Sequence, residues 1–363
     1  METADAEAFL RTIRGEPYDD APRLVFADWL EEHGQPERAE FIRLQCELAN
    51  LSPYSPRRPA LEKRQKQLWR QHKSLWRASL PSKVRACDFH RGFAHPYRLQ
   101  LSARQFLTFP DHCFDAAPLW GVRFHLANSD ALRELVHSPR LAYIASLDIS
   151  AKNVDGDLLR QLVASHYLAN LVGLGIDVHP FTTEHVQALA ASPHFVRLRK
   201  LAITCSPIGP EVAEAIAASP HLAELESLEL NHCGIGDAGL RAITESHYLT
   251  KLRELKLHQN GLSTDSARAL MGGTHLKRLA VLRLYCNHLG DDGARALAIA
   301  PGMERLTDLD LGYNRIGPDG ARALAQSRYL SHLEHLFLGG NRFTEDSTAL
   351  LALRSRFNGR VIV

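Results

Sequence analysis

The chain has 363 residues, of which 45% are hydrophobic and 23% are charged, and its formal net charge is +2. A chain of this length exceeds what one compact core usually supports, so we expect either two domains or an elongated array of repeats. No segment offers the roughly 18 uninterrupted apolar residues that a membrane span requires, which excludes a bilayer-spanning helix. The polar, acidic start lacks the features of a secretory signal, so we expect a cytoplasmic protein.

Residues 1–50 are predicted to form a small helical domain. Apolar residues recur at helical spacing in three short stretches between residues 4 and 49, and Pro22 and Gly34 suit a helix start and a helix end. Residues 1–49 contain twelve acidic and five basic residues. We therefore expect an acidic unit of three short helices.

Residues 51–116 are predicted to form a basic linker helix and an N-terminal cap. Residues 50–100 contain twelve basic and two acidic residues, and a helix is expected from Leu61 to Ser79. Its apolar stripe should pack on the preceding helices or on the first repeat, and it consists of Leu61, Leu68, Trp69, Leu75 and Trp76. The segment from Phe89 to Leu101 should add strand structure to the cap. Alternatively, residues 57–98 form a basic arm that carries Trp69 and Trp76 to nucleic acid or to an acidic partner.

Residues 117–363 contain a pattern that repeats every 27 residues about nine times. Each copy has the spacing LxxLxL, whose last two apolar residues lie on one face of a short strand. The central leucine of the pattern shows the period, with Leu147, Leu174, Leu201, Leu228, Leu255, Leu282, Leu309 and Leu336. One period earlier, Trp120 and Val122 mark a degenerate first repeat that begins near Ala117.

The second half of each repeat has the spacing of a helix. One apolar anchor per repeat faces inward, in the series Leu135, Leu162, Leu189, Ile216, Ile243, Leu270, Leu297, Leu324 and Leu351. Glycines at Gly239, Gly293 and Gly320 should permit close approach at the start of a helix. One repeat cannot bury both its strand and its helix, so the copies must stack into a curved solenoid.

Polar residues follow the strands at a fixed position. Asn260, Asn287, Asn314 and Asn341 stand there in four repeats, and Cys233 stands there in a fifth. A buried amide at this place can bind the backbone of the loop into which it turns. At the C-terminal end, residues 360–363 are expected to add a last strand that covers the exposed edge.

This pattern resembles the leucine-rich repeats of the ribonuclease-inhibitor subtype. The resemblance covers Ala117 to about Leu351 and implies an α/β horseshoe solenoid, with parallel strands on the concave face and helices on the convex face. The stretches 23–32 and 38–45 resemble the short companion domain that precedes such repeats in many bacterial proteins. The expected protein is thus a bacterial solenoid behind a small all-α domain.

No set of residues with the spacing of a catalytic, phosphate-binding or metal site emerges, so we expect no enzyme, cofactor or metal. The six cysteines form no CxxC pair, which argues against a zinc site and a disulfide framework. We expect them to be buried free thiols: Cys46, Cys87, Cys113, Cys205, Cys233 and Cys286.

The strands should present a binding surface. The residue between the two apolar positions of each strand, and the residue two places later, should point into the concave face. Nine strands spaced by about 4.8 Å give a face long enough for a standard protein interface. From about the fifth repeat this face combines charged and aromatic residues, and we predict a partner-binding patch of Glu229, Asn231, Lys256, His258, Arg283, Tyr285, Asp310, Tyr313 and Phe337.

The leading hypothesis is a monomeric, non-enzymatic scaffold that binds a protein partner on its concave face. A plain solvated surface is the competing interpretation of the same residues. Two further alternatives are a regulator of a small GTPase, which rests on analogy of fold alone, and a nucleic-acid binder that uses residues 57–98. Nucleic acid is the less favoured partner.

Overall fold

The computed structural model describes residues 2–51, 55–78, 80, 88–95, 100–109, 121–126, 129–152, 155–273, 275–343, 348–357 and 361–362. Its contacts divide the chain into two compact units. The first comprises residues 1–150 with 170–172, and the second comprises residues 151–169 with 173–363. The boundaries predicted from the sequence, after residues 50 and 116, stay a prediction.

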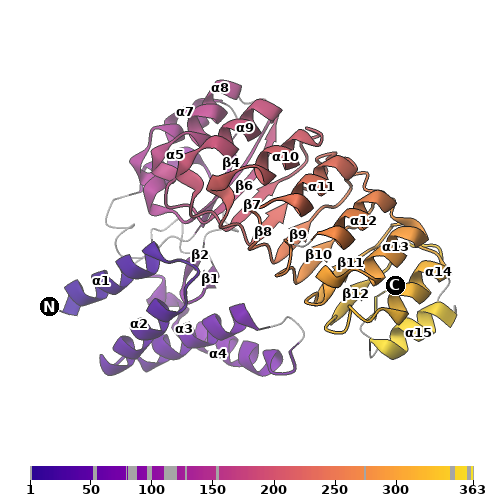
Figure 1. Cartoon of the computed structure of the whole chain (residues 1–363). Helices are drawn as coiled ribbons and strands as arrows, with labels where there is room; N and C mark the ends of the chain where they lie inside the picture. Colours follow the sequence, from indigo (N-terminus) through magenta and orange to yellow (C-terminus); the bar gives the residue numbers. More distant parts are fainter. Residues whose placement is uncertain are drawn as a thin grey trace. The chain divides into compact units, whose positions relative to one another are not determined.

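The first unit begins with four helices, labelled in Figure 1: α1 (Glu2–Gly15), α2 (Ala21–Glu32), α3 (Pro36–Asn50) and α4 (Arg58–Trp76). The three short helices and the basic helix predicted from the sequence are therefore confirmed. Pro22 lies in the first turn of α2, and Gly34 follows that helix with a φ of +76°. A left-handed φ suits glycine because it has no Cβ to clash.

Helix α4 packs its two tryptophans against aromatic residues of the same unit. The Trp69 ring stacks on Phe41, with centroids 5.7 Å apart, and lies 4.9 Å from Phe89. The Trp76 ring lies 4.7 Å from Phe41. The predicted apolar stripe is wrong at Leu75, which is 72% exposed because it points away from this cluster.

Short strands complete the described part of the first unit. Strands β1 (Asp88–His90) and β2 (Phe93–His95) form an antiparallel hairpin. Farther along, the strands run in the order β3, β4, β5, and β3 pairs parallel with β4. The remaining elements are β3 (Gln100–Leu101), α5 (Ala103–Leu107), β4 (Gly121–Leu126), α7 (Ser129–Val136), η2 (Pro139–Tyr143) and β5 (Ser146–Lys152). The strand structure expected near Phe89 to Leu101 is thus confirmed for the residues described, whereas 96–99 and 117–120 lie outside them.

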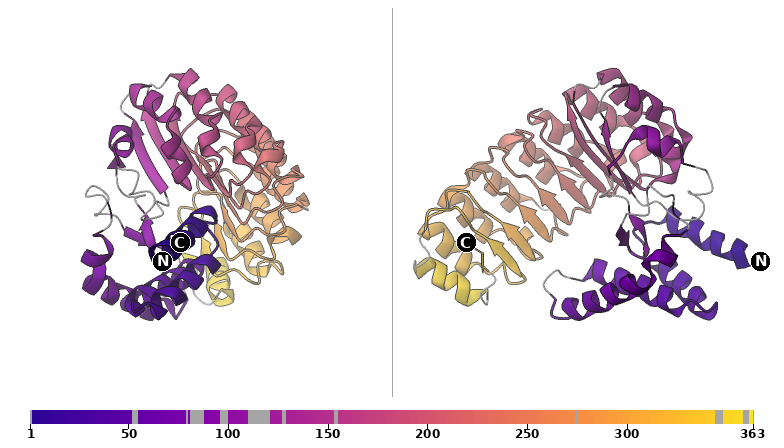
Figure 2. Two further views of the ribbon diagram at one scale, coloured as in Figure 1. Left: turned by 90° about the vertical axis from the view of Figure 1, so that its left-hand side faces the viewer. Right: turned by 180° about the vertical axis from the view of Figure 1, so that it is seen from behind.

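The second unit alternates strands and helices along the residues that the structure describes. Its strands β6 to β13 lie side by side in sequence order in one sheet, and its helices lie along one side of that sheet (Figures 1 and 2). The strands are β6 (Gly173–His179), β7 (Lys200–Ile203), β8 (Ser227–Glu229), β9 (Glu254–Lys256), β10 (Val281–Arg283), β11 (Asp308–Asp310), β12 (His335–Phe337) and β13 (Val361–Ile362).

The helices of this unit are α8 (Gly156–Val163), α9 (Thr183–Ala191), α10 (Glu211–Ala217), α11 (Gly236–Glu245), α12 (Thr264–Gly272), α13 (Gly290–Ala298), α14 (Pro318–Gln326) and α15 (Thr348–Arg356). Short 3₁₀ turns follow several of them: η3 (His166–Leu168), η4 (Pro193–Phe195), η5 (Pro220–Leu222) and η6 (Pro301–Met303). A Cβ at Gly239 would lie 3.1 Å from Ala213 Cβ on the preceding helix. The close approach that the glycines predicted is therefore present.

The register of the sheet reproduces the 27-residue period. Leu201 pairs with Leu228, which in turn pairs with Leu255, and this continues to Leu336. These leucines are at most 1% exposed, so they form a continuous row in the core. The last strand was also predicted correctly, because Val361 pairs parallel with Leu336.

The asparagines form the expected ladder. The side-chain oxygens of Asn260, Asn287 and Asn341 each accept from two backbone nitrogens of the preceding repeat, as Asn341 does from Asn314 at 2.9 Å and from Ile316 at 3.0 Å. That of Asn314 accepts from the Leu289 nitrogen at 3.4 Å. The side-chain nitrogen donates back to that repeat, as from Asn314 to the Leu284 carbonyl at 2.8 Å. At the same position, the Cys233 thiol lies 3.2 Å from the Ile203 carbonyl. Polar groups that burial would otherwise leave unpaired are thereby satisfied.

Candidate functional site

The predicted patch lies on one side of the second unit, which we call the strand face, opposite the helices. Because side chains alternate along a strand, the leucines enter the core and their neighbours remain half-buried on this face. Five of the predicted residues end strands β8 to β12: Glu229, Lys256, Arg283, Asp310 and Phe337. Asn231, His258 and Tyr285 follow two places later, and Tyr313 lies in the loop after β11.

The first group of these residues is held by ion pairs. The ammonium of Lys256 lies 2.9 Å from Glu254 and 3.6 Å from Glu229, while Asn231 donates a hydrogen bond to Glu229 at 2.7 Å. Burial opposes ionisation of Glu254, but the Ser227 hydroxyl and Lys256 outweigh it and hold the pKa of this carboxyl below its ordinary value. These charges are consequently arranged before any partner binds.

The second group is aromatic. The Tyr285 ring meets Tyr313 edge-on, with centroids 5.2 Å apart, and lies 6.5 Å from Phe337 and 5.7 Å from His258. Gly312 makes this packing possible, since a Cβ there would lie 2.5 Å from Phe337 Cε1 and 3.0 Å from Tyr285 Cδ2. The sequence placed these rings in separate repeats, and the fold gathers them around one glycine.

Asp310 and His258 lie beside these rings. The Asp310 carboxylate accepts a hydrogen bond from the backbone nitrogen of Gly312 at 2.9 Å. Burial raises the pKa of Asp310 above its ordinary value, despite the opposing influence of Gly312, His258 and Arg283. Burial also lowers the pKa of His258, and its Nε2 atom is buried without a hydrogen-bond partner. Their surroundings therefore disfavour the charged forms of both side chains.

Three residues of this surface escaped the prediction. Glu254 and Asp308 begin their strands and pair with Lys256 and Arg283, the latter with Nε 3.3 Å from Asp308. Strand alternation was a usable signal, because each lies two places before a predicted residue. Alternation also places Gly312 on this face, two residues after Asp310, but it could not predict the role of this glycine, because a missing side chain matters only once the neighbouring rings are known.

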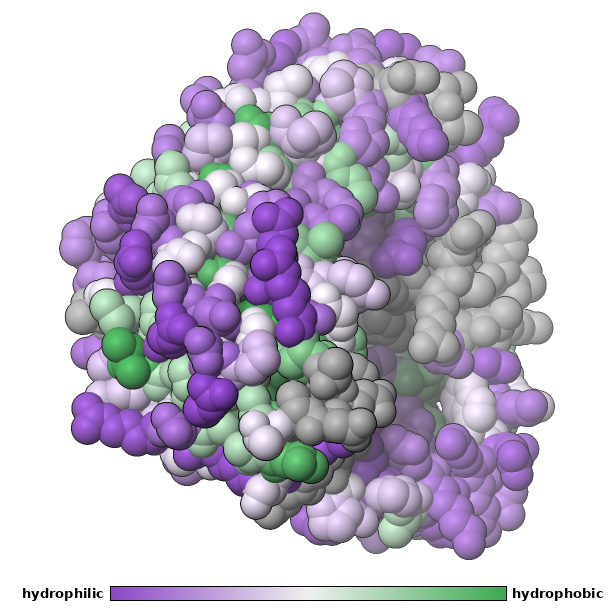
Figure 3. All heavy atoms as spheres, turned by 90° about the vertical axis from the view of Figure 1, so that its right-hand side faces the viewer, coloured by the Kyte–Doolittle hydropathy of each residue, from purple (hydrophilic) through white to green (hydrophobic). Residues whose placement is uncertain are grey.

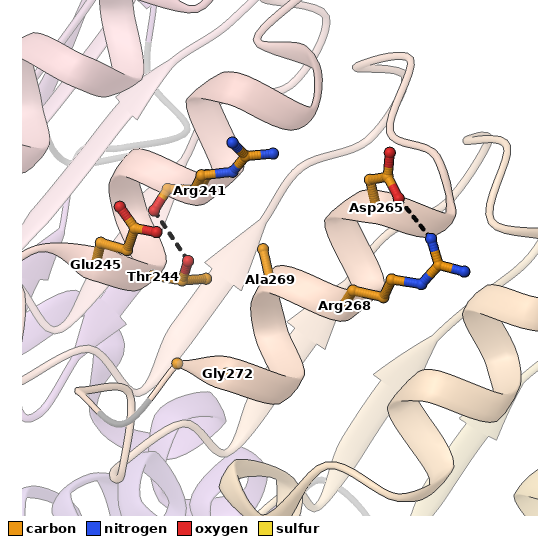
Figure 4. A pocket seen from close by; sticks show the side chains of 8 residues that line it. Arg241, Thr244, Glu245, Asp265, Arg268, Ala269 and Gly272 are labelled. Atoms are coloured by element: carbon orange, nitrogen blue, oxygen red, sulfur yellow. Dashed lines mark hydrogen bonds and ion pairs between the residues drawn. The ribbon is translucent and has the colours of Figure 1, made fainter.

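A second candidate is a pocket of about 420 Å³ on the helix side (Figure 4). It lies between α11 and α12, and its lining comprises Arg241, Thr244, Glu245, Asp265, Arg268, Ala269, Gly272 and Gly273. Arg268 pairs with Asp265 at 2.7 Å, and both are exposed, as are Arg241 and Glu245. This mixed-charge surface is well solvated, and we assign it no function.

The basic segment has partners of its own. Arg64 pairs with Glu40 at 2.7 Å, and Arg57 pairs with Glu47 at 2.6 Å. Together with the packing of Trp69 and Trp76 described above, these contacts support the interpretation of α4 as a packed helix of the first unit. They leave Arg57, Arg64 and the two tryptophans less available for nucleic acid.

The cysteines correct one expectation. Cys46 and Cys233 are buried free thiols as predicted, but Cys205 is exposed because it lies in the loop after β7, and Cys286 is half-buried. Cys87 and Cys113 lie outside the described residues. Among the residues that are described, no three His, Cys, Asp or Glu side chains are grouped to hold a metal ion.

The second unit stacks repeats of 27 residues in register, with strands on one side, helices on the other and a buried asparagine ladder. These features define a leucine-rich-repeat solenoid. The family model for the leucine-rich repeat matches the chain at residues 221–243, 274–298 and 305–325. No curated protein matches the sequence. None of the described helices is long and apolar enough to cross a membrane.

Solved structures with a similar chain path include the yeast Rad7–Elc1 complex, with 17% identity, a TM-score of 0.48 and coverage of 91% of this chain and 87% of that chain. A Bacteroides fragilis protein has 17% identity and a TM-score of 0.45, over 68% and 70% of the two chains. The TLR13–ssRNA13 complex has 18% identity and a TM-score of 0.40, over 68% of this chain and 35% of that chain.

Proposed function

We propose that the protein is a non-enzymatic interaction scaffold that binds a protein partner on the strand face of repeats five to nine. The observation that carries this proposal is the aromatic cluster of Tyr285, Tyr313 and Phe337. Tyr313 is 53% exposed although its ring packs on Tyr285, so an amphipathic surface of fixed geometry faces solvent. Rigid aromatic residues beside arginine are the usual sites where binding energy concentrates.

The organisation of the surrounding charges supports the same proposal. Lys256 and Arg283 are both held by carboxylates of the strand face, so little side-chain freedom is lost when a partner binds. On the face that Figure 3 shows, hydrophilic residues predominate and hydrophobic ones form small separate patches. A solvated surface needs no aromatic cluster, which favours the binding interpretation over the plain one.

A capture experiment with a paired variant tests the proposal. Tagged wild-type protein and the double variant Arg283→Ala, Tyr285→Ala are used to capture partners, with quantification by mass spectrometry. The matched control is Arg268→Ala with Tyr248→Ala, which removes the same residue types from exposed positions outside the strand face. Loss of specific partners in the first variant alone is expected, whereas equal capture by all three proteins would reject the strand face.

The finer features predicted from the sequence belong to the same proposal. We infer a cytoplasmic, bacterial, monomeric protein with ribonuclease-inhibitor-type repeats, in which residues 1–50 form the companion domain. The repeat length of 27 residues supports the repeat type, and the three helices α1 to α3 support the companion domain. Regulation of a small GTPase and nucleic-acid binding stay predictions that their own assays would have to support.

A further inference from the structure

The charges of the strand face leave one carboxylate without a counter-ion. From β8 to β12 this face carries four carboxylates, those of Glu229, Glu254, Asp308 and Asp310, and two permanent cations, those of Lys256 and Arg283. Lys256 pairs with both glutamates, and Arg283 pairs with Asp308. Within the described part of the chain, Asp310 is the member of this set that has no ion pair.

The position of Asp310 is fixed by the backbone beside it. Its carboxylate accepts from the Gly312 nitrogen at 2.9 Å, and the rings of Phe337 and Tyr285 lie over the same glycine. Tyr313 extends the aromatic surface toward solvent and contacts the next loop, where a Cβ at Gly340 would lie 2.6 Å from its ring. The half-buried carboxylate of Asp310 and the three aromatic rings thus lie around Gly312.

This combination matches one ligand group. A guanidinium is planar and always charged, binds a carboxylate through two parallel hydrogen bonds, and stacks on aromatic rings. Burial opposes ionisation of Asp310, and a bound cation would offset that penalty. The excess of carboxylates over cations on this face disfavours an acidic peptide or a nucleic-acid backbone.

We propose that Asp310 and the aromatic cluster of Tyr285, Tyr313 and Phe337 receive an arginine side chain from a basic segment of a partner protein. This inference rests on the proposed function and names the chemistry of the partner. The guanidinium pairs with Asp310 and stacks on the tyrosines. Lys256 and Arg283, each already paired, keep their present contacts.

Fluorescence anisotropy with defined peptides tests the inference on the full chain. The probe is a fluorescein-labelled peptide of alternating arginine, glycine and serine, compared with matched peptides in which lysine or glutamate replaces arginine. The arginine peptide is expected to bind most tightly, and Asp310→Asn is expected to weaken it by about tenfold or more because a charged hydrogen bond is lost. Equal binding of the three peptides, or no binding of the arginine peptide, overturns the inference.

Asp177→Asn is the matched control. Asp177 is an exposed carboxylate of β6 on the same face, so this variant makes the same charge change away from the aromatic cluster. Its affinity for the arginine peptide should stay within about twofold of wild type, since exposed charges at a distance are screened. If both variants weaken binding equally, the effect is general electrostatics, and the site at Asp310 is rejected.

A second pair of variants tests the stacking contribution. Tyr313 has a φ of +54°, a backbone conformation that asparagine adopts readily, so Tyr313→Asn removes the ring with little backbone cost. It should weaken the arginine peptide about fivefold or more, whereas Tyr313→Phe, which keeps the ring, should bind like wild type. Unchanged affinity in Tyr313→Asn would refute the stacking contact.

The same variants separate this inference from the proposed function. If Arg283→Ala with Tyr285→Ala abolishes partner capture but Asp310→Asn leaves it intact, the strand face binds partners without an arginine at Asp310. If no partner depends on the strand face although the arginine peptide responds to Asp310→Asn, the site exists and the scaffold proposal fails. Thermal unfolding of each variant establishes that the fold is retained.

Discussion

The side-chain oxygen of Asn287 accepts a hydrogen bond from the backbone nitrogen of Asn260, which lies one repeat earlier, at 3.0 Å. It also accepts from the Leu262 nitrogen at 3.0 Å, while the Asn287 amide donates to the Leu257 carbonyl at 3.0 Å. One side chain therefore satisfies backbone groups of the loop that leads out of the neighbouring strand. Neighbouring repeats are thus joined by these hydrogen bonds as well as by the leucines buried between them.

Replacing Asn287 by alanine should destabilise the second unit strongly. Asn287 is 1% exposed, so two backbone nitrogens would remain buried and unpaired. The expected loss is about 2–6 kcal/mol in the free energy of unfolding, from about 1–3 kcal/mol for each of the two unsatisfied nitrogens. Urea denaturation measures it, with Asn170→Ala as a control because Asn170 is exposed and lies outside the ladder. A loss below about 1 kcal/mol would show that water replaces the amide.

Asp237 holds the N-terminus of helix α12 of the following repeat, whose N-cap residue is Ser263. Its carboxylate accepts from the Ser263 nitrogen at 2.9 Å and from the Ser263 hydroxyl at 2.6 Å, and also from the Ser266 hydroxyl. Asp237→Ala should lower the free energy of unfolding by about 1.5–3 kcal/mol, the usual contribution of a hydrogen bond to a charged group. Urea denaturation measures this loss. Asp265→Ala, which removes an exposed carboxylate of the same helix, should lower the free energy of unfolding much less.

The contribution of Asp237 should also depend on pH. Burial opposes ionisation, but hydrogen bonds from Ser263 and Ser266 outweigh it and hold the pKa of Asp237 below the ordinary value of 3.8. A depressed folded-state pKa stabilises the fold above pH 3.8, and this stabilisation is lost as the pH falls through the folded-state pKa. The stability gap between wild type and Asp237→Ala should therefore narrow in acid, and a constant gap would contradict an ionised Asp237.

Gly312→Ala should disturb the aromatic cluster of the strand face. The added methyl group would lie 2.5 Å from Phe337 Cε1, so the ring must move, at a cost of about 1–3 kcal/mol for an overpacked site. Near-ultraviolet circular dichroism and thermal unfolding report the change. Gly272→Ala is the control, because a Cβ there meets nothing within 4 Å. Equal spectra and stability in both variants would show that the rings adjust freely.

Alkylation should distinguish the cysteines. Burial raises the pKa of both Cys46 and Cys233 to about 12, so these thiols stay protonated and shielded at neutral pH. Cys205 is exposed and should react with iodoacetamide in the native protein. Mass spectrometry should find Cys205 modified within minutes and Cys233 modified only after unfolding. Rapid native labelling of Cys233 would reveal local opening of its repeat.

Much of the fold could be predicted because the same pattern of apolar residues occurs in every repeat. Leucines at a constant offset, such as Leu228 and Leu255, identify each strand and its neighbour, and the observed pairing joins these residues. The prediction was weaker for α4, where the helical stripe wrongly included Leu75. A single helix offers only one copy of its pattern, so local spacing cannot tell which apolar residues find a packing partner.

The sequence predicted which residues of the candidate site share a face of the sheet, but not which of their charges pair. Alternation along the strands indicated that Arg283 and Tyr285 share a face, and the structure places them there. Alternation could not show that Asp308 pairs with Arg283 and that Asp310 has no ion pair among the described residues. Both aspartates lie on β11, and the distance of each carboxylate from Arg283 on β10 decides which of them forms the ion pair.

The 27-residue periodicity was enough to predict the repeat, the position of the asparagine ladder and the side of the sheet on which the residues of the predicted patch lie. The stacking of the repeats decided that Asn287 accepts from Asn260, that Asp237 accepts from Ser263 at the start of the next helix, and that three rings gather around Gly312. These contacts join residues about 27 positions apart, and only the tertiary structure sets their distances.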